Sequence, residues 1–220
     1  MCGIVGYIGQ RDCPLFLLNA LRYLEYRGYD SAGIAIIQND QIFCHRAQGK
    51  LVVLEELLKR KPLTGSIGIG HTRWATHGVP SEINAHPHVV DNIALVHNGI
   101  IENYSLLKNK LQKKGAKFLS QTDTEVIAHL VAFSLKETND FVKAVYKAIS
   151  QLKGSFALAI LSAKEPDKLI GVRWESPLIV GLAENENVLA SDVPAILPYT
   201  KKVIFLNDGE IAILYKDKVE

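Results

Sequence analysis

The sequence predicts an α+β protein in which two mainly antiparallel sheets are covered by helices. Apolar and β-branched residues alternate in short strand-like runs toward both ends of the chain, whereas leucines recur at helical spacing in the middle. Strands at the two ends with helices between them do not fit a simple alternation of parallel strands and helices. No linker or repeat divides the 220 residues, so we expect residues 1–220 to form a single domain.

The expected elements fall into three parts: strands with two helices in the first part of the chain, three helices in the middle and strands in the last part. Strands are predicted at residues 2–8, 32–37, 41–45, 67–71 and 93–97, with helices at 15–24 and 51–58 between them. Helices are predicted at residues 103–113, from 122 onward and at 141–152. Five short strands follow, at residues 156–161, 169–172, 178–181, 203–206 and 211–215. Two turns, Asn39-Asp40 and Asn207-Asp208-Gly209, are predicted to close hairpins.

The composition is that of an ordinary folded protein. Of its residues 48% are hydrophobic, and 25 Lys plus Arg against 23 Asp plus Glu leave a formal net charge of +2. That balance argues against a nucleic-acid or membrane-surface protein, because phosphate binding needs a concentrated excess of basic side chains. Three cysteines and the lack of an apolar leader or spanning stretch predict a cytoplasmic protein without a disulfide framework.

The N-terminus offers a candidate nucleophile. Removal of Met1 would place the thiol of Cys2 beside a free α-amine, and the small side chain of Cys2 should permit that removal. An α-amine has an unperturbed pKa of about 7.7–8.0, so it can accept the thiol proton near neutrality. Taken alone, a cysteine at position two is more often accidental than catalytic.

A second candidate is the run His71-Thr72-Arg73-Trp74-Ala75-Thr76-His77-Gly78, which follows a predicted strand and is expected to form an exposed loop. An arginine such as Arg73 can hold a carboxylate through two parallel hydrogen bonds. On composition alone the alternative is equally good: Arg73 is then a solvated surface charge and Trp74 a core anchor.

A third candidate is the pair Asn98-Gly99 at the end of an apolar strand. The amide of Asn98 and the backbone N–H of Gly99 could converge on the oxyanion that forms in acyl transfer. The alternative is a plain Asn-Gly turn, which is the favoured interpretation without further context.

Asp123 and Arg27 each allow two interpretations. The run Thr122-Asp123-Thr124-Glu125 has the form of a capping box, and the first turn of a helix stabilises a carboxylate such as Asp123. Asp123 could instead accept the ammonium group of an amino-acid substrate. Arg27 is either part of an ion pair at a turn or a positive charge that helps Cys2 to ionise.

Taken together, these segments resemble the class II glutamine amidotransferases, which are N-terminal nucleophile hydrolases. Cys2-Gly3 is shared by the whole class, whereas two runs are similar to its sugar-phosphate branch, whose acceptor is fructose 6-phosphate. These runs are Tyr26-Arg27-Gly28-Tyr29-Asp30-Ser31 and residues 71–78. Further similar segments lie at residues 84–88, 97–104 and 122–130, so the resemblance spans nearly the whole chain.

The resemblance implies a four-layer αββα fold and hydrolysis of L-glutamine to glutamate and ammonia. Cys2 resembles the nucleophile, and Asn98 and Gly99 resemble the oxyanion donors. Arg73 and Asp123 resemble the groups that bind the α-carboxylate and the α-ammonium of glutamine. The other residues carried over belong to the loop that closes over glutamine or support the site: Trp74, Thr76, His77, His86 and Arg27.

The resemblance also implies a γ-glutamyl thioester on Cys2, with no cofactor and no metal ion. Longer relatives carry a C-terminal sugar-isomerising domain that would use the ammonia to make glucosamine 6-phosphate, and a homodimer or larger assembly is expected to depend mainly on that domain. One departure from the pattern is Glu175, which stands where a small residue, commonly glycine, is usual. The turn before Ser176-Pro177 is therefore expected to differ locally.

Two other classes of function remain open from the sequence. A metal hydrolase could use four histidines, although their spacing matches no recognised metal site: His71, His77, His86 and His88. The chain could also be a regulatory module that binds glutamine without hydrolysing it, in which case retention of Met1 would be the simplest sign.

Overall fold

The computed structural model describes residues 2–75 and 78–220, which form two sheets. The larger sheet contains, in spatial order, β11 (Val203–Phe205), β9 (Ile179–Ala183), β10 (Glu186–Ala190), β1 (Gly3–Ile8), β4 (Ile67–Arg73), β2 (Ser31–Gln38) and β3 (Gln41–Gln48). The smaller sheet contains β12 (Ile211–Leu214), β8 (Leu169–Trp174), β7 (Gly154–Ser162), β6 (Ile93–Ile101) and β5 (His88–Val90). Every neighbouring pair of these strands is antiparallel.

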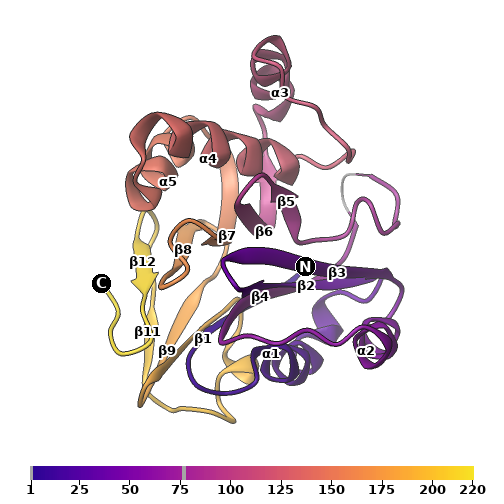
Figure 1. Cartoon of the computed structure of the whole chain (residues 1–220), viewed down its shortest axis with the longest axis vertical. Coiled ribbons are helices and arrows are strands. Elements are labelled where there is room, and N and C mark those ends of the chain that lie inside the picture. The colour runs from indigo at the N-terminus through magenta and orange to yellow at the C-terminus, as the bar shows by residue number, and fades with distance from the viewer. Residues whose placement is uncertain (1, 76–77) are drawn as a thin grey trace.

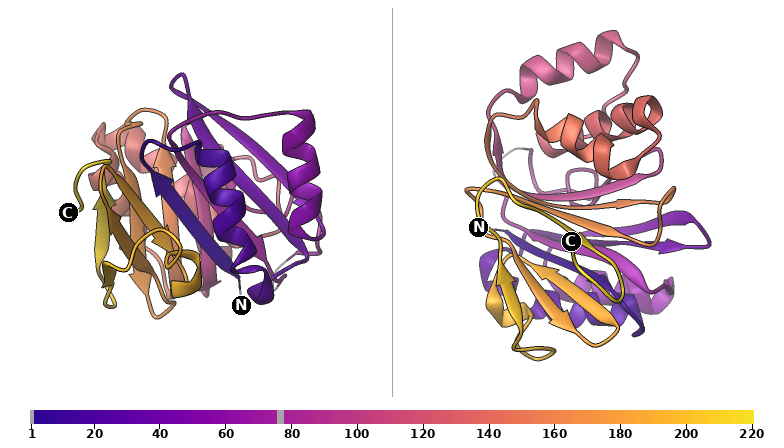
Figure 2. Two further views of the ribbon diagram at one scale, coloured as in Figure 1. Left: turned by 90° about the horizontal axis from the view of Figure 1, so that it is seen from below. Right: turned by 90° about the vertical axis from the view of Figure 1, so that its left-hand side faces the viewer.

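The two sheets lie face to face between two layers of helices (Figure 1; Figure 2, right). Helices α1 (Cys13–Arg22) and α2 (Leu51–Arg60) cover the outer face of the larger sheet. Helices α4 (Thr124–Thr138) and α5 (Phe141–Ile149) cover the smaller sheet, and α3 (Tyr104–Lys113) extends beyond α4. The predicted α+β architecture is confirmed. Within the described residues, no helix has the length and apolar content needed to cross a bilayer.

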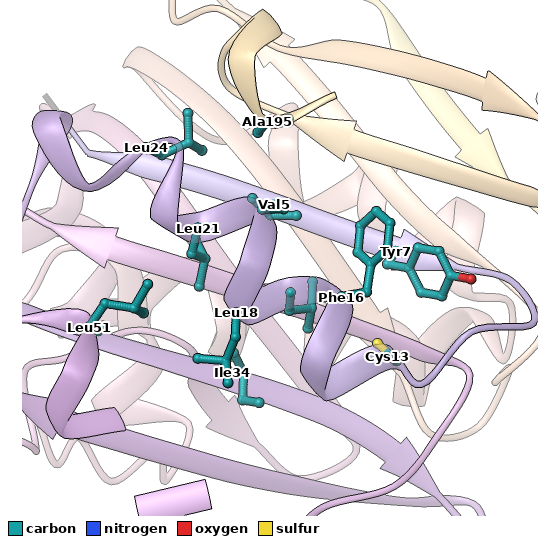
Figure 3. Packing of buried hydrophobic residues seen from close by; sticks show 14 of the residues in the cluster. Val5, Tyr7, Cys13, Phe16, Leu18, Leu21, Leu24, Ile34, Leu51 and Ala195 are labelled. Carbon is teal, nitrogen blue, oxygen red and sulfur yellow. The ribbon is translucent and has the colours of Figure 1, made fainter. Parts of the chain in front are cut away.

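Strand alternation divides the apolar side chains of each sheet between two layers. Along β1, Val5 and Tyr7 pack under α1, while Ile4 and Ile8 point into the space between the sheets. Figure 3 shows Val5 and Tyr7 in the outer cluster, where the ring of Phe16 stacks on Tyr7 with centroids 4.1 Å apart. Successive side chains of a strand face opposite sides of the sheet. Because both faces of this sheet are covered, every residue of β1 is buried and its sequence is a nearly continuous apolar run.

The layer between the sheets is apolar over most of its length. Its members include Ile67 and Ile69 from β4, and Ala94 and Val96 from β6. Continuing the same alternation, the next inward-facing positions are His71 and Arg73 on β4 and Asn98 on β6, while Cys2 precedes Ile4 on β1. One end of an otherwise apolar layer is therefore polar.

The two predicted hairpins have different outcomes. Asn39 and Asp40 have φ values of 50° and 56° and join β2 to β3 with Gln38 opposite Gln41, as a two-residue hairpin requires. The hairpin predicted at residues 207–209 is wrong, because β11 pairs with β9 whereas β12 pairs with β8 of the other sheet. The turn forms, and Gly209 has φ +84°, but it carries the chain from one sheet to the other.

The predicted capping box at the start of α4 is also wrong. The N-cap residue is Asp123, and its side chain makes no capping hydrogen bond. The Thr122 hydroxyl instead contacts His88 Nε2 at 2.9 Å, and the Glu125 carboxylate accepts from the backbone N–H groups of Leu119 and Ser120. The Thr-x-x-Glu spacing predicted that Thr122 and Glu125 would cap the first turn of the helix. Both side chains instead form hydrogen bonds with residues of preceding segments.

The turn that contains Glu175 explains the usual preference for glycine there. Glu175 has φ +62°, a left-handed conformation that costs an ordinary residue roughly 1–2 kcal/mol. The turn nevertheless forms, because Glu175 N–H donates to Asp208 Oδ1 at 2.8 Å and Ser176 N–H donates to Trp174 O at 2.7 Å. The chain thus crosses from β8 to β9, and hence from one sheet to the other, with Ser176 and Pro177 at the crossing.

Two leucines of α1 test the contribution of the outer core. Leu17 is fully buried, whereas Leu15, two residues earlier on the same helix, is 54% exposed. We expect Leu17→Ala to lower the free energy of unfolding by about 2–5 kcal/mol through lost burial and a residual cavity. The matched variant Leu15→Ala should change it by less than about 0.5 kcal/mol. Denaturant unfolding measures both, and equal losses would contradict this packing.

Candidate active site

The polar end of the inter-sheet layer opens into a cavity of about 300 Å³. Both sheets, the N-terminus of α4 and the crossing between β8 and β9 contribute to its walls. The lining residues are Cys2, Arg27, Arg73, Trp74, His86, His97, Asn98, Gly99, Ile100, Thr122, Asp123, Thr124, Ser155, Ser176 and Pro177. Every described residue that the sequence analysis assigned to the site is on this wall.

Cys2 lies immediately before β1 and presents its sulfur to the cavity. The Sγ atom accepts a hydrogen bond from Trp74 N–H at 3.2 Å and its thiol hydrogen faces Trp74 O at 3.5 Å. Burial raises the pKa of this thiol, while the Trp74 N–H and the charge of Arg73 act in the opposite direction. The net pKa is raised, so a neighbouring base has to take the proton before the sulfur can act as a nucleophile.

Asn98 and Gly99 lie beside Cys2 at the end of β6. The Nδ2 of Asn98 donates to the carbonyl oxygen of Cys2 at 3.0 Å, across the gap between the sheets. Gly99 has φ +128°, and a Cβ atom there would lie 2.0 Å from the Ser155 carbonyl oxygen, so the position admits only glycine. Both residues line the same cavity as Cys2.

Arg73, the last residue of β4, and Asp123, the N-cap residue of α4, supply opposite charges to the same cavity. Both are buried, with 3% and 5% of their surfaces exposed. The prediction of an exposed loop is wrong for residues 71–73, which are buried in β4, and so is the alternative of a solvated Arg73 with a buried Trp74. Arg73 Nη2 donates to the carbonyl oxygen of Gly78 at 3.0 Å, and Asp123 Oδ2 accepts from Ile101 N–H at 2.8 Å. A ligand that carries both a carboxylate and an ammonium group would match this pair of charges.

Arg27 connects the start of β1 to the segment that follows the neighbouring strand β10. Its Nε donates to the carbonyl oxygen of Cys2 at 3.1 Å, and its Nη1 forms an ion pair with Asp192 Oδ2 at 2.6 Å. The hydroxyl of Tyr26 donates to the same carboxylate oxygen at 2.6 Å. Of the two interpretations of Arg27, the structure shows the ion pair, which holds the backbone of the candidate nucleophile in place.

Trp74 lies at the mouth of the cavity. It is 48% exposed and meets the ring of Tyr29 edge-on, with centroids 5.5 Å apart. The next residue, Ala75, donates its N–H to the Asp30 carboxylate, which ties the loop to the segment before β2. Thr76 and His77, the other two loop residues carried over from the resemblance, lie outside the described residues.

His86 supports the site through Thr124. One hydroxyl, Thr124 Oγ1, lies 2.8 Å from His86 Nε2 and 3.0 Å from His97 Nδ1. Burial lowers the pKa of His86 well below its ordinary value, and it lowers the pKa of His71 and His88 to about 3. These imidazoles are therefore neutral near pH 7. Among residues 2–75 and 78–220, no three His, Cys, Asp or Glu side chains are grouped to hold a metal ion.

A chain of hydrogen bonds organises the segment before α4. Ser120 Oγ donates to Glu125 Oε2 at 2.7 Å, so the Thr122 hydroxyl, 3.0 Å from Ser120 Oγ, must donate to Ser120. Thr122 Oγ1 can then only accept from His88 Nε2, which consequently carries a hydrogen. The Glu125 carboxylate thus determines the direction of every bond in this chain and fixes the backbone next to Asp123.

Three further residues hold this site together; the sequence analysis considered His71 only as a metal ligand and assigned no role to Asp30 or Asp192. His71 contacts Asn98, Asp30 holds the loop after Trp74, and Asp192 pairs with Arg27. His71 and Asp30 stood in segments that carried the resemblance, but nothing in the spacing indicated their partners. Asp192 is 165 residues from Arg27 in the chain, and no local signal could have found it.

Comparisons with known proteins identify the family of the chain. Residues 71–198 match the family described as "Glutamine amidotransferase domain". The chain is 56% identical over 222 residues to the glutamine--fructose-6-phosphate aminotransferase [isomerizing] of Aquifex aeolicus (strain VF5). It is 55% identical over 219 residues to the same enzyme of Thermococcus kodakarensis. These alignments cover 100% and 99% of this chain but only 37% and 36% of the relatives.

Solved structures show the same fold. A glutamine phosphoribosylpyrophosphate amidotransferase from B. subtilis superposes with a TM-score of 0.83 at 26% identity, covering 100% of this chain and 48% of the other. An enzyme described as the allosteric regulatory enzyme of purine biosynthesis gives 0.84 at 27% identity, with the same coverage. The predicted four-layer αββα fold of the N-terminal nucleophile amidotransferases is confirmed.

The Glu125 chain leads to a prediction on stability. Replacing the carboxylate by an amide in Glu125→Gln removes one acceptor and points an N–H₂ group at the donors of Leu119 or Ser120. We expect the free energy of unfolding at pH 7 to fall by about 1–3 kcal/mol, the usual cost of losing hydrogen bonds to a buried charge. The control Glu137→Gln, at an exposed position of the same helix, should leave it unchanged within error in chemical denaturation.

The same carboxylate predicts a pH dependence. Burial alone would raise the pKa of Glu125, but the nearby His129 ring and the hydrogen bonds from Leu119 and Ser120 lower it from 4.5 to about 2. A lowered pKa in the folded state stabilises the protein above about pH 4.5, and this contribution is lost as the pH falls toward 2. The stability difference between the wild-type protein and Glu125→Gln should shrink over this interval; a constant difference would contradict the assignment.

Proposed function

Because the chain belongs to the glutamine amidotransferase family, we propose that residues 1–220 form one amidotransferase domain that hydrolyses L-glutamine through a γ-glutamyl thioester on Cys2. The observation that carries this proposal is the arrangement around one sulfur. Asn98 and Gly99 offer N–H donors on one side of the cavity, and the charges of Arg73 and Asp123 lie on the same wall. The products are glutamate and ammonia.

Glutamine binding follows from the two buried charges. Arg73 binds the α-carboxylate and Asp123 binds the α-ammonium group, which leaves the γ-amide directed toward Cys2. The Ile101 N–H bond to one oxygen of Asp123 leaves its other oxygen for the ligand. A cavity of about 300 Å³ is at the lower end of the range for small-molecule sites and suits an amino acid.

The α-amine of Cys2 supplies the base that the buried thiol needs. After removal of Met1, this amine takes the thiol proton, and the sulfur attacks the γ-amide carbon. The carbonyl oxygen becomes an oxyanion held by the Asn98 amide and the Gly99 N–H. Collapse of this tetrahedral intermediate breaks the C–N bond, ammonia leaves with the proton from the α-ammonium, and a γ-glutamyl thioester remains.

Hydrolysis of the thioester completes the cycle. The freed α-amine takes a proton from a water molecule, whose oxygen attacks the thioester carbon at the same oxyanion site. Glutamate is released and the thiol is restored. We propose that Trp74, Thr76 and His77 cover bound glutamine, so that bulk water is excluded while ammonia forms. His86 supports the site through its contact with Thr124, and Arg27 through the carbonyl of Cys2.

The fate of the ammonia is a further part of the proposal. The chain spans 36–37% of the length of the curated relatives it matches. Those relatives are named for fructose 6-phosphate and for isomerisation. We propose that a second domain, outside this sequence, takes the ammonia to make glucosamine 6-phosphate and provides most of the contacts of a homodimer or larger assembly. We also propose a cytoplasmic location, because a reducing compartment protects a catalytic thiol from oxidation.

Replacement of the nucleophile is the first test. Cys2→Ala should release no glutamate above background while still binding glutamine, because the charged groups that hold the substrate remain. The wild-type chain, incubated with 6-diazo-5-oxo-L-norleucine, should lack Met1 and gain one adduct on Cys2 by intact mass and peptide mapping. The matched variant Cys44→Ala, which alters a half-buried thiol outside the cavity, should keep both activity and labelling.

Three results would overturn the proposed function. Glutamate release by Cys2→Ala that a chelator abolishes would favour the metal hydrolase. Glutamine binding by a wild-type chain that retains Met1 and never releases glutamate would favour the regulatory module. An adduct on a residue other than Cys2 in an active enzyme would assign the nucleophile elsewhere.

Asp123 is tested by the charge of the substrate. Asp123→Asn keeps an acceptor for Ile101 N–H but removes the charge that pairs with the ammonium, so kcat/KM for glutamine should fall about 10- to 150-fold. With 4-carbamoylbutanoate, which lacks the α-amino group, the same variant should show no further loss. Glu102→Gln makes the same change at an exposed nearby position and should leave both substrates unaffected. Equal losses with both substrates would contradict the assignment.

A further inference from the structure

A buried histidine lies directly behind the candidate oxyanion site. The Nε2 of His71 is 3.1 Å from Asn98 Oδ1 and 3.2 Å from the backbone carbonyl oxygen of His97. His71 is fully buried on β4 and faces the smaller sheet, and it is not among the residues that line the cavity. It therefore does not reach a bound substrate but touches a residue that does.

The position of the hydrogen on this ring follows from its neighbours. A backbone carbonyl such as that of His97 can only accept a hydrogen bond, so Nε2 of His71 must carry a hydrogen. The atom of the Asn98 amide that faces Nε2 must then also be an acceptor, and this places Oδ1 there and Nδ2 on the opposite side, 3.0 Å from the Cys2 carbonyl oxygen. A flipped amide would set two donors together at His71 and two acceptors together at Cys2.

We propose that His71 is a positioning residue for the reaction: its Nε2–H holds the Asn98 amide with the nitrogen, and not the oxygen, turned toward the site where the oxyanion forms. This inference rests on the proposed function and adds a residue to its machinery. Without His71 the amide is free to turn over, and a carbonyl oxygen beside a developing negative charge repels it. Loss of one such donor typically costs about 10²–10³-fold in kcat.

His71 performs this role as a neutral ring. Its Nδ1 has no hydrogen-bond partner within the described part of the chain, and the ring stacks on His86 with centroids 4.3 Å apart. A second hydrogen on Nδ1 would have no acceptor, and burial lowers the pKa of His71 to about 3. The ring thus stays in one tautomer over the working pH range and takes part by orientation, not by proton transfer.

Two variants of His71 test the role. His71→Phe keeps a flat ring without the donor and should lower kcat for glutaminase activity about 10²–10³-fold with KM within about threefold of wild type. His71→Gln offers an N–H₂ group near the position of Nε2 and should recover at least tenfold of that loss. Thermal unfolding shows whether each variant is folded, and glutamate binding by calorimetry reports an intact substrate site.

A double-mutant cycle separates this role from a general structural one. If His71 acts through Asn98, then His71→Phe should cause no further loss of kcat in the Asn98→Ala background. Affinity for the γ-aldehyde analogue of glutamine, which forms a thiohemiacetal whose oxygen occupies the oxyanion site, should fall in His71→Phe in parallel with kcat. Affinity for glutamate should stay within threefold.

The outcomes separate the two proposals. If the wild-type chain releases glutamate but the losses of His71→Phe and Asn98→Ala multiply, or His71→Gln recovers nothing, the positioning role is wrong while the proposed function stands. If the wild-type chain releases no glutamate and takes no adduct on Cys2, the proposed function itself fails.

Discussion

The face-to-face packing of two antiparallel sheets is the constraint on which the rest of this structure depends. Alternation along β1, β4 and β6 sends every second side chain into the space between the sheets, where isoleucine, valine and alanine exclude water. At one end the same positions carry Cys2, His71, Arg73 and Asn98. The site is therefore a continuation of the core, and its groups are held by strands paired along their whole length.

Most of the buried polar groups of the site are held by hydrogen bonds, and at His71 and His88 the direction of these bonds is defined by their neighbours. Desolvation keeps His71 and His88 neutral, so these rings work as donors in fixed tautomers. Glu125 is the exception, since the donors around its carboxylate outweigh the cost of burying the charge. The site thus combines neutral imidazoles with the charges of Arg73 and Asp123, which would match a zwitterionic ligand.

Much of the candidate site could be predicted from residue types. A thiol beside the N-terminus, an amide-glycine pair and an arginine each suggest a chemical role, and the cavity brings Cys2, Asn98, Gly99 and Arg73 together. Their setting differs from the expected one, because Arg73 lies in β4 and Asn98-Gly99 lie within β6. Their supporting partners could not be predicted. Asp192 and His71 act on residues 165 and 27 positions away, and no periodic pattern records such contacts.

The sequence by itself determined where most strands and helices form, because periodicity and turn chemistry act over a few residues. It did not predict β5 or β10, two short strands of three and five residues. Asn39-Asp40 forms the predicted hairpin because both residues adopt the positive φ that a two-residue turn requires. Only the tertiary structure decided that the turn at residues 207–209 joins two sheets and that Thr122 and Glu125 leave the capping box for distant partners. Strand pairing and buried hydrogen bonds are selected by the packing of the whole chain, so local signals identify the elements but not their neighbours.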